Sequence, residues 1–182
     1  MKNIRAIFMG TPEFAVPILK SLIANLNVIM VVTQPDKEVG RHHEIQESPI
    51  KKLALESNIK VVQPIKIRND YTDIINAHPD IIITCAYGQI IPKIILDEPK
   101  YGCINVHASF LPELRGGAPL QHAIIDGYNK TGITIMYMAE GMDDGDIISQ
   151  MPYEIKPTDT YGDLVNNLSN MGVNLLLKTL PD

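Results

Sequence analysis

Short apolar runs rich in isoleucine and valine alternate along this chain with segments whose apolar residues recur at helical spacing, and this alternation is the strongest constraint on the fold. Strands are predicted at residues 4–9, 28–32, 61–62 and 80–85, with helical segments between them. Strands that are apolar on both faces are typical of a parallel sheet covered by helices. The sequence therefore predicts an α/β fold.

The second half of the chain continues the alternation of strands and helices and then adds an antiparallel pair of strands. We expect a strand at 102–106, helices at 119–126 and 160–177, and strands at 132–138 and 147–153 that pair antiparallel. The predicted architecture is a Rossmann-like open, mostly parallel sheet with helices on both faces. Ligands bind such sheets beyond the carboxyl ends of the strands, so the loops after residues 9, 33, 84 and 106 are the candidate site.

Length and composition limit the class of protein. A chain of 182 residues with 45% hydrophobic and 20% charged residues predicts one folded domain, and a net charge of −5 argues against general polyanion binding. The longest apolar stretch, 81–96, is interrupted and too short to span a membrane, and no signal peptide is recognisable, so we expect a cytoplasmic protein. Cys85 and Cys103 lack metal-ligand spacing and are predicted to be buried free thiols.

Two sequence segments give expectations about local structure. After the first predicted strand, Thr11, Pro12 and Glu13 are typical of a helix start, with Thr11 as the N-cap. The polar segment 34–47 is predicted to be a long loop, and Ser48 with Pro49 starts the next helix.

Asn105 and His107 lie two residues apart at the end of a predicted strand, which places both side chains on one side of it. An imidazole can move a proton near neutral pH, and an amide can donate a hydrogen bond to a developing oxyanion. The loop that follows, 109–119, holds apolar residues and a glycine pair that could offer backbone groups and a flat apolar wall to a planar ligand. The alternative is a structural histidine beside an Asx turn.

Three carboxylates, Asp143, Asp144 and Asp146, occur in the predicted turn 141–146. The turn lacks the spacing and the closing glutamate of a calcium loop, so we expect no metal there. One carboxylate could contact His107 and fix its tautomer, with the others as turn formers or surface charges. A fully solvated acidic turn is the alternative.

These motifs in their order resemble those of the 10-formyltetrahydrofolate-dependent formyltransferases. The resemblance rests on Asn105 to His107 and on segments 109–112, 115–121, 134–136 and 142–146. Segments 9–17, 34–37 and 86–92 make it closest to the branch of the family that acts on tRNA.

The resemblance implies formyl transfer from 10-formyltetrahydrofolate to the α-amine of methionyl initiator tRNA, for translation initiation. It implies Asn105, His107 and Asp143 as the catalytic residues, with no metal and no obligate protein partner. It also implies that segment 86–92 walls the pterin pocket and that four residues line the folate: Ser109, Phe110, Leu111 and Pro112.

Two features depart from the family pattern. The segment 37–47 corresponds to a basic loop that reaches toward the tRNA acceptor end, but three glutamates lower its positive charge, and Arg41 is the expected phosphate contact. A mobile surface loop is the alternative. Family members also carry a C-terminal β-barrel domain that binds tRNA, so we expect residues 1–182 to be the formyltransferase catalytic domain without it.

Other functions remain open at this point. The same three residues would serve an enzyme that formylates an amino-sugar nucleotide or glycinamide ribonucleotide, or a hydrolase that passes the formyl group to water. A nucleotide-binding or structural module is a different class, but the sequence has neither a GxGxxG motif after the first strand nor a Walker lysine.

Overall fold

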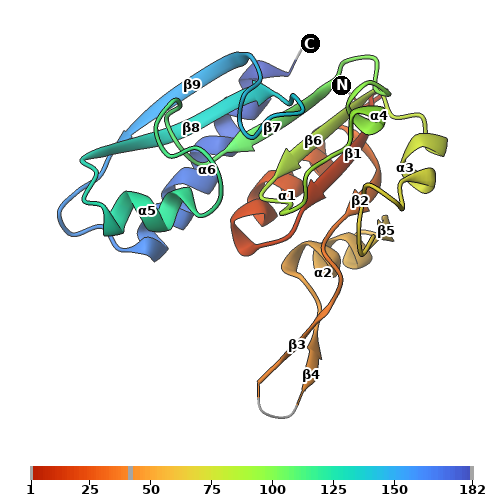
Figure 1. Ribbon diagram of the computed structural model, residues 1–182, viewed down its shortest axis with the longest axis horizontal. Helices are drawn as coiled ribbons and strands as arrows, with labels where there is room; N and C mark the ends of the chain where they lie inside the picture. Colours follow the sequence, from red (N-terminus) through yellow and green to blue (C-terminus); the bar gives the residue numbers. More distant parts are fainter. Residues whose placement is uncertain (1, 41–42, 181–182) are drawn as a thin grey trace.

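The computed structural model describes residues 2–40 and 43–180, which contain a seven-stranded sheet with the order β5-β2-β1-β6-β7-β8-β9 (Figure 1). Five strands run parallel, and β8 and β9 are antiparallel to their neighbours. The strands are β1 (Arg5–Gly10), β2 (Asn27–Val32), β5 (Lys60–Val62), β6 (Ile81–Cys85), β7 (Cys103–His107), β8 (Lys130–Tyr137) and β9 (Ile147–Glu154). The predicted open, mostly parallel sheet is confirmed.

Alternate residues of β1 enter two different hydrophobic clusters, which shows that both faces of the sheet are covered. Ala6 and Phe8 belong to the cluster that includes α1, α2, α5 and α6, whereas Ile7 and Met9 belong to the cluster with α3 and α4. The helices are α1 (Val16–Asn25), α2 (Pro49–Glu56), α3 (Thr72–Asn76), α4 (Lys93–Leu96), α5 (Pro119–Ile125) and α6 (Tyr161–Thr179). The prediction of helices on both faces is confirmed.

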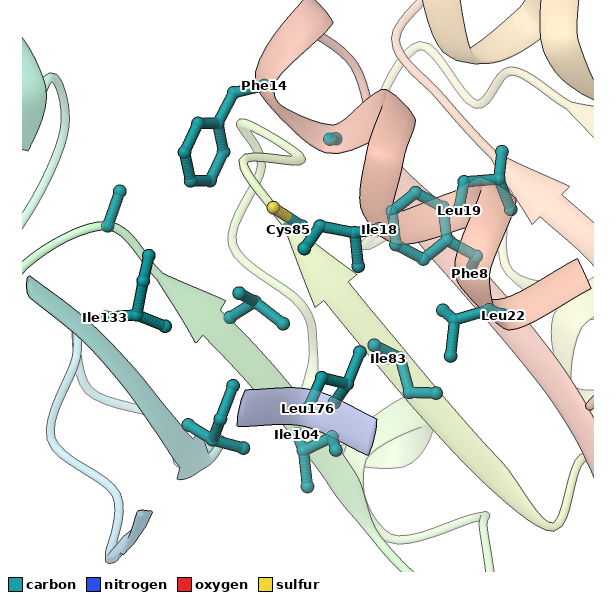
Figure 2. Close-up of a cluster of buried hydrophobic side chains, with 14 of the residues drawn as sticks. Phe8, Phe14, Ile18, Leu19, Leu22, Ile83, Cys85, Ile104, Ile133 and Leu176 are labelled. Atoms are coloured by element: carbon teal, nitrogen blue, oxygen red, sulfur yellow. The ribbon is translucent and has the colours of Figure 1, made fainter. Parts of the chain in front are cut away.

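The larger cluster packs α1 and α6 closely against the sheet. Figure 2 shows Ile18 and Leu22 of α1 with Ile83 of β6 and Leu176 of α6, all fully buried. A Cβ atom at Gly172 of α6 would come within 3.0 Å of the Ile18 side chain, so the absence of a side chain allows this close approach. No helix in the described part of the chain is long and apolar enough to cross a membrane.

A capping box fixes the start of α6. The Thr160 side chain accepts a hydrogen bond from the Asp163 backbone N–H, and the Asp163 carboxylate accepts one from the Thr160 backbone N–H at 2.8 Å. We expect Thr160→Ala to lower the free energy of unfolding by about 1 kcal/mol, because the first turn loses a capping partner. Urea denaturation measures this change. Thr158→Ala, three residues before the helix, is the matched control, and an equal loss in both variants would contradict the capping explanation.

The predicted N-cap at Thr11 is wrong. A short 3₁₀ helix, η1 (Glu13–Ala15), with Pro12 at its N-cap position, precedes α1. The Thr11 hydroxyl instead donates to the carbonyl oxygen of Tyr87 at 3.0 Å. A tertiary partner on the neighbouring loop therefore replaces the local capping interaction that the sequence suggests. The predicted cap at Ser48 is confirmed, since its side chain accepts from the Lys51 backbone N–H.

The prediction of a long loop at 34–47 is also wrong in part, because two strands lie within this segment. β3 (Lys37–Val39) and β4 (Glu44–Gln46) form an antiparallel hairpin in which Lys37 pairs with Gln46. Figure 1 shows this hairpin extending away from the body of the sheet. Its strands contain few apolar residues, and for this reason hydrophobic periodicity alone does not reveal it.

The two cysteines are buried free thiols, as predicted. Burial raises the pKa of Cys85, and it raises the pKa of Cys103 to about 12. Because the thiolate is the reactive form, we expect neither cysteine to react with a charged disulfide reagent at pH 8 in the folded protein. Both should react once the chain is unfolded in guanidinium. Rapid labelling of the native protein would contradict this burial.

Candidate active site

A cavity of about 710 Å³ opens at the carboxyl ends of β1, β6 and β7. Its lining comes from residues 12–14 after β1, from Thr84 with 86–91 at the end of β6, from 105–108, from 116–121 and from 138–143. The site therefore lies where ligands bind open α/β sheets, and its volume is typical of a small-molecule pocket.

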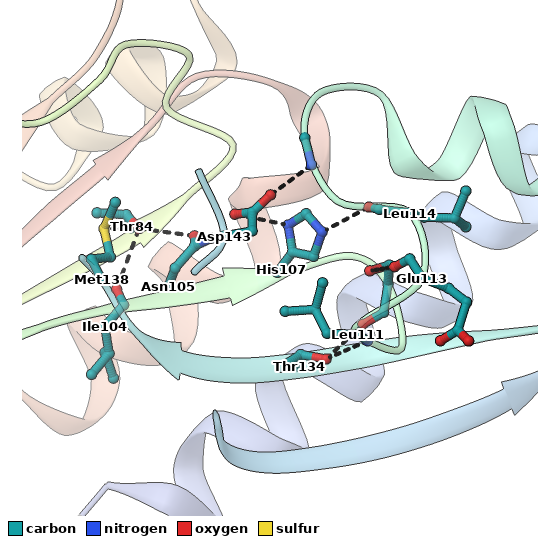
Figure 3. A network of polar contacts seen from close by, with 12 residues as sticks. Thr84, Ile104, Asn105, His107, Leu111, Glu113, Leu114, Thr134, Met138 and Asp143 are labelled. Carbon is teal, nitrogen blue, oxygen red and sulfur yellow. Dashed lines mark hydrogen bonds and ion pairs between the residues drawn. The ribbon is translucent and has the colours of Figure 1, made fainter. Parts of the chain in front are cut away.

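His107, the last residue of β7, is 7% exposed and is held from both sides (Figure 3). Its Nε2 atom lies 3.1 Å from the carbonyl oxygen of Leu114, and its Nδ1 atom lies 3.7 Å from Oδ1 of Asp143. A carbonyl oxygen only accepts, so Nε2 must carry a proton. The Nδ1–Oδ1 distance is too long for a hydrogen bond, and this contact is electrostatic. Nδ1 is thus the nitrogen that can exchange a proton beside the carboxylate.

Asp143 is directed inward by the backbone of its turn. The residue has a left-handed φ of 49°, and its Oδ2 atom accepts a hydrogen bond of 2.7 Å from the Gly116 backbone N–H. A Cβ atom at Gly145 would collide with the carbonyl oxygen of Tyr137, so this turn requires glycine there. Asp144 and Asp146 are exposed, as predicted, and Asp144 lies 4.0 Å from Arg115.

Asn105 is the third predicted catalytic residue, and the structure places it on the same cavity as His107 and Asp143. It lies two residues before His107 on β7 and is half-buried. The Thr84 hydroxyl donates to its Oδ1 atom at 2.8 Å. Sequence reasoning missed Thr84, because a single threonine in an apolar strand gives no signal of a site.

The residues predicted to line the folate, Ser109 to Pro112, do not line this cavity. Ser109 is fully buried and donates to the Glu113 carbonyl oxygen at 2.7 Å, and the Leu111 N–H donates to the Thr134 hydroxyl at 3.2 Å. The Phe110 ring packs against the Lys130 ammonium at 4.5 Å. These residues anchor the loop whose continuation, 116–121, does line the cavity, and their contact with folate stays a prediction.

The wall formed by 86–91 is cross-linked to neighbouring loops. Gln89 accepts from the Ile67 N–H at 2.8 Å and donates to Oε1 of Gln34 at 3.1 Å, and Gln34 in turn donates to the Tyr87 carbonyl oxygen at 3.1 Å. Burial raises the pKa of the Tyr87 hydroxyl to about 12. The Gln34 contacts join the base of the β3–β4 hairpin to the cavity wall.

The residues outside the cavity include two surface histidines, and one predicted contact cannot be placed. Arg41, the expected phosphate contact, lies outside the described residues. His78 and His122 pair on the surface with Glu98 and Asp126 at 3.1 and 3.2 Å. Within residues 2–40 and 43–180, no group of three or more His, Cys, Asp or Glu side chains is arranged to hold a metal ion.

The fold and this site define a class of protein. The family model for formyl transferases matches residues 2–180, and the chain belongs to that family. Two curated relatives with high similarity to this chain belong to one branch of this family. The chain is 54% identical over 181 residues to methionyl-tRNA formyltransferases of Bacillus cytotoxicus and of a Geobacillus species, and each alignment covers 98% of this chain. It covers only 58% and 57% of the two relatives, so the chain spans less than two thirds of their length.

Solved structures share the fold at low sequence identity. Phosphoribosylglycinamide formyltransferase of Bacillus halodurans superposes with a TM-score of 0.79 at 20% identity, over 96% of this chain and 92% of that one. A formyltetrahydrofolate deformylase of Pseudomonas syringae gives 0.73 at 20% identity, over 97% of this chain and 59% of that one. These two proteins are named for different reactions. The shared fold therefore does not identify the molecule that accepts the formyl group.

Proposed function

We propose that this chain transfers a formyl group from 10-formyltetrahydrofolate to the α-amine of methionyl initiator tRNA, a step of translation initiation. The observation that carries the proposal is the convergence of Asn105, His107 and Asp143 on one cavity. The 54% identity to methionyl-tRNA formyltransferases supports this acceptor over the alternatives.

Each of the three side chains has a role in direct amine attack on the formyl carbon. The attack creates a tetrahedral oxyanion, which the Asn105 amide and a protonated His107 can stabilise as hydrogen-bond donors. The attacking nitrogen must lose a proton, which the Asp143 carboxylate beside Nδ1 of His107 can receive. The folate nitrogen takes up a proton as it leaves, so the reaction balances without a covalent enzyme intermediate.

The cavity suits a planar formyl donor. Ile91, Met138 and Leu120 contribute apolar lining, and Gly116 and Gly117 leave the backbone free of side chains at those two positions. Such a wall can stack on a flat ring while peptide groups bind its polar edge. We propose residues 1–182 as the catalytic unit. Its net charge of −5 predicts weak affinity for tRNA by this unit alone.

The direct test is formyl transfer from 10-formyltetrahydrofolate to methionyl initiator tRNA at high protein concentration, with folate binding followed in parallel by calorimetry. Parallel reactions contain glycinamide ribonucleotide, an amino-sugar nucleotide or no acceptor. We expect formylated methionyl-tRNA as the product. Transfer only to a small amine would show that this amine, and not methionyl-tRNA, is the formyl acceptor. Formate release without an amine would indicate a hydrolase. Absence of folate binding would overturn the proposal.

A further inference from the structure

Thr84 and Asn105 lie side by side at the ends of two neighbouring parallel strands. The two residues are register partners in the β6–β7 ladder. Thr84 is only 2% exposed, yet it also lies at the base of the cavity. The Thr84 hydroxyl is 2.8 Å from Oδ1 of Asn105 (Figure 3). A buried hydroxyl therefore contacts a predicted catalytic amide directly.

The direction of this hydrogen bond determines which end of the amide is free. A carboxamide oxygen accepts and never donates, so the Thr84 hydroxyl must be the donor. The oxygen of Asn105 is thereby held against β6, and the NH₂ group forms the other arm of the planar amide. Among the residues that the structure describes, Nδ2 of Asn105 has no hydrogen-bond partner. Its two protons are available to a ligand in the cavity.

The orientation matters because the two ends of an amide have opposite effects on an anion. With NH₂ toward the cavity, Asn105 can donate to an oxyanion, whereas an amide rotated by half a turn would present an oxygen that repels it. Other acceptors near the Thr84 hydroxyl are farther away: the Ile104 carbonyl oxygen at 3.3 Å and the Met138 sulfur at 3.2 Å, which is a weak acceptor. The short contact to Asn105 is thus the favoured one.

We propose that Thr84 is a positioning residue of the formyl-transfer reaction, whose hydroxyl holds the Asn105 amide with its donors directed into the cavity. This inference rests on the proposed function. Thr84 acts through Asn105 and touches no reacting atom. Its contribution is to fix a donor before the oxyanion forms, so the effect falls on the chemical step rather than on substrate binding.

Thr84→Val tests the proposal, because valine has nearly the same shape and lacks the hydroxyl. We expect kcat to fall about tenfold, less than the 10²- to 10³-fold cost of deleting an oxyanion donor, since a freely rotating amide is still correctly oriented part of the time. The KM values for folate and acceptor should change less than twofold. Thr84→Ser, which retains the donor, should keep most of the wild-type kcat.

A double-mutant cycle with Asn105→Ala separates positioning from a general structural effect. In the Asn105→Ala background, Thr84→Val should cause no further loss of kcat, because there is no amide left to orient. Thermal unfolding followed by circular dichroism checks that each variant folds, with Thr84→Ala as the second hydroxyl deletion. Wild-type kcat in both deletion variants, or an undiminished loss in the Asn105→Ala background, would overturn this inference alone. An inactive wild-type protein would instead refute the proposed function.

Discussion

His107→Ala is expected to reduce kcat for formyl transfer by about 10²- to 10⁴-fold, the range typical of a lost general acid–base group. The imidazole is buried against the cavity, and the Leu114 carbonyl oxygen fixes the protonated Nε2, which leaves Nδ1 beside Asp143 for proton transfer. Single-turnover transfer measures the chemical step separately from product release. Folate affinity by calorimetry should change little.

The matched control for this variant is His122→Ala. His122 lies on α5 with its side chain 55% exposed and paired with Asp126, so transfer should remain at the wild-type rate. If His107→Ala loses the circular-dichroism signal of the folded protein, the residue is structural. If it folds and transfers formyl groups normally, the catalytic assignment is wrong.

Asp143→Ala is expected to lower kcat by about 10²-fold or more, comparable to the loss of one preorganised electrostatic group in an active site. The carboxylate has two contacts that alanine cannot replace: one oxygen faces Nδ1 of His107, and the other accepts from the Gly116 N–H. Loss of both would free the imidazole and loosen the cavity wall at residue 116. Single-turnover kinetics again provide the measurement.

Asp144→Ala is the control, because this neighbouring carboxylate is 67% exposed and lies at the edge of the site. Residues that act as one unit are not additive, so the His107→Ala, Asp143→Ala double variant should be about as slow as the slower single variant. Full additivity of the two losses would show that the pair does not work together. Equal losses in the Asp143 and Asp144 variants would indicate a general charge effect.

Much of the fold could be predicted because its local patterns agree with its packing. Ile18 and Leu22 recur at helical spacing on α1, and both are fully buried. The apolar segment 81–85, in which Thr84 is the one polar residue, predicts a buried strand, and β6 is buried along its whole length. In both cases the pattern of apolar residues follows the faces of the element that contact the core, so the sequence alone predicts the burial.

The wrong N-cap prediction has a physical cause, which is that a tertiary partner competes with a local interaction. Thr11 has the residue type of an N-cap but donates to the Tyr87 carbonyl oxygen. This partner lies 76 residues further along the chain, and a local sequence pattern does not include it.

By itself the sequence determined the mostly parallel α/β sheet, the two-residue spacing that puts Asn105 and His107 on one side of β7, and the acidic turn that follows β8. Only the tertiary structure decided that Asp143, rather than Asp144 or Asp146, faces His107, and that Thr84 holds Asn105. Strand periodicity is a local property of the chain. The direction of a side chain in a turn depends on hydrogen bonds and close contacts with distant backbone, such as those of Gly116 with Asp143 and of Tyr137 with Gly145.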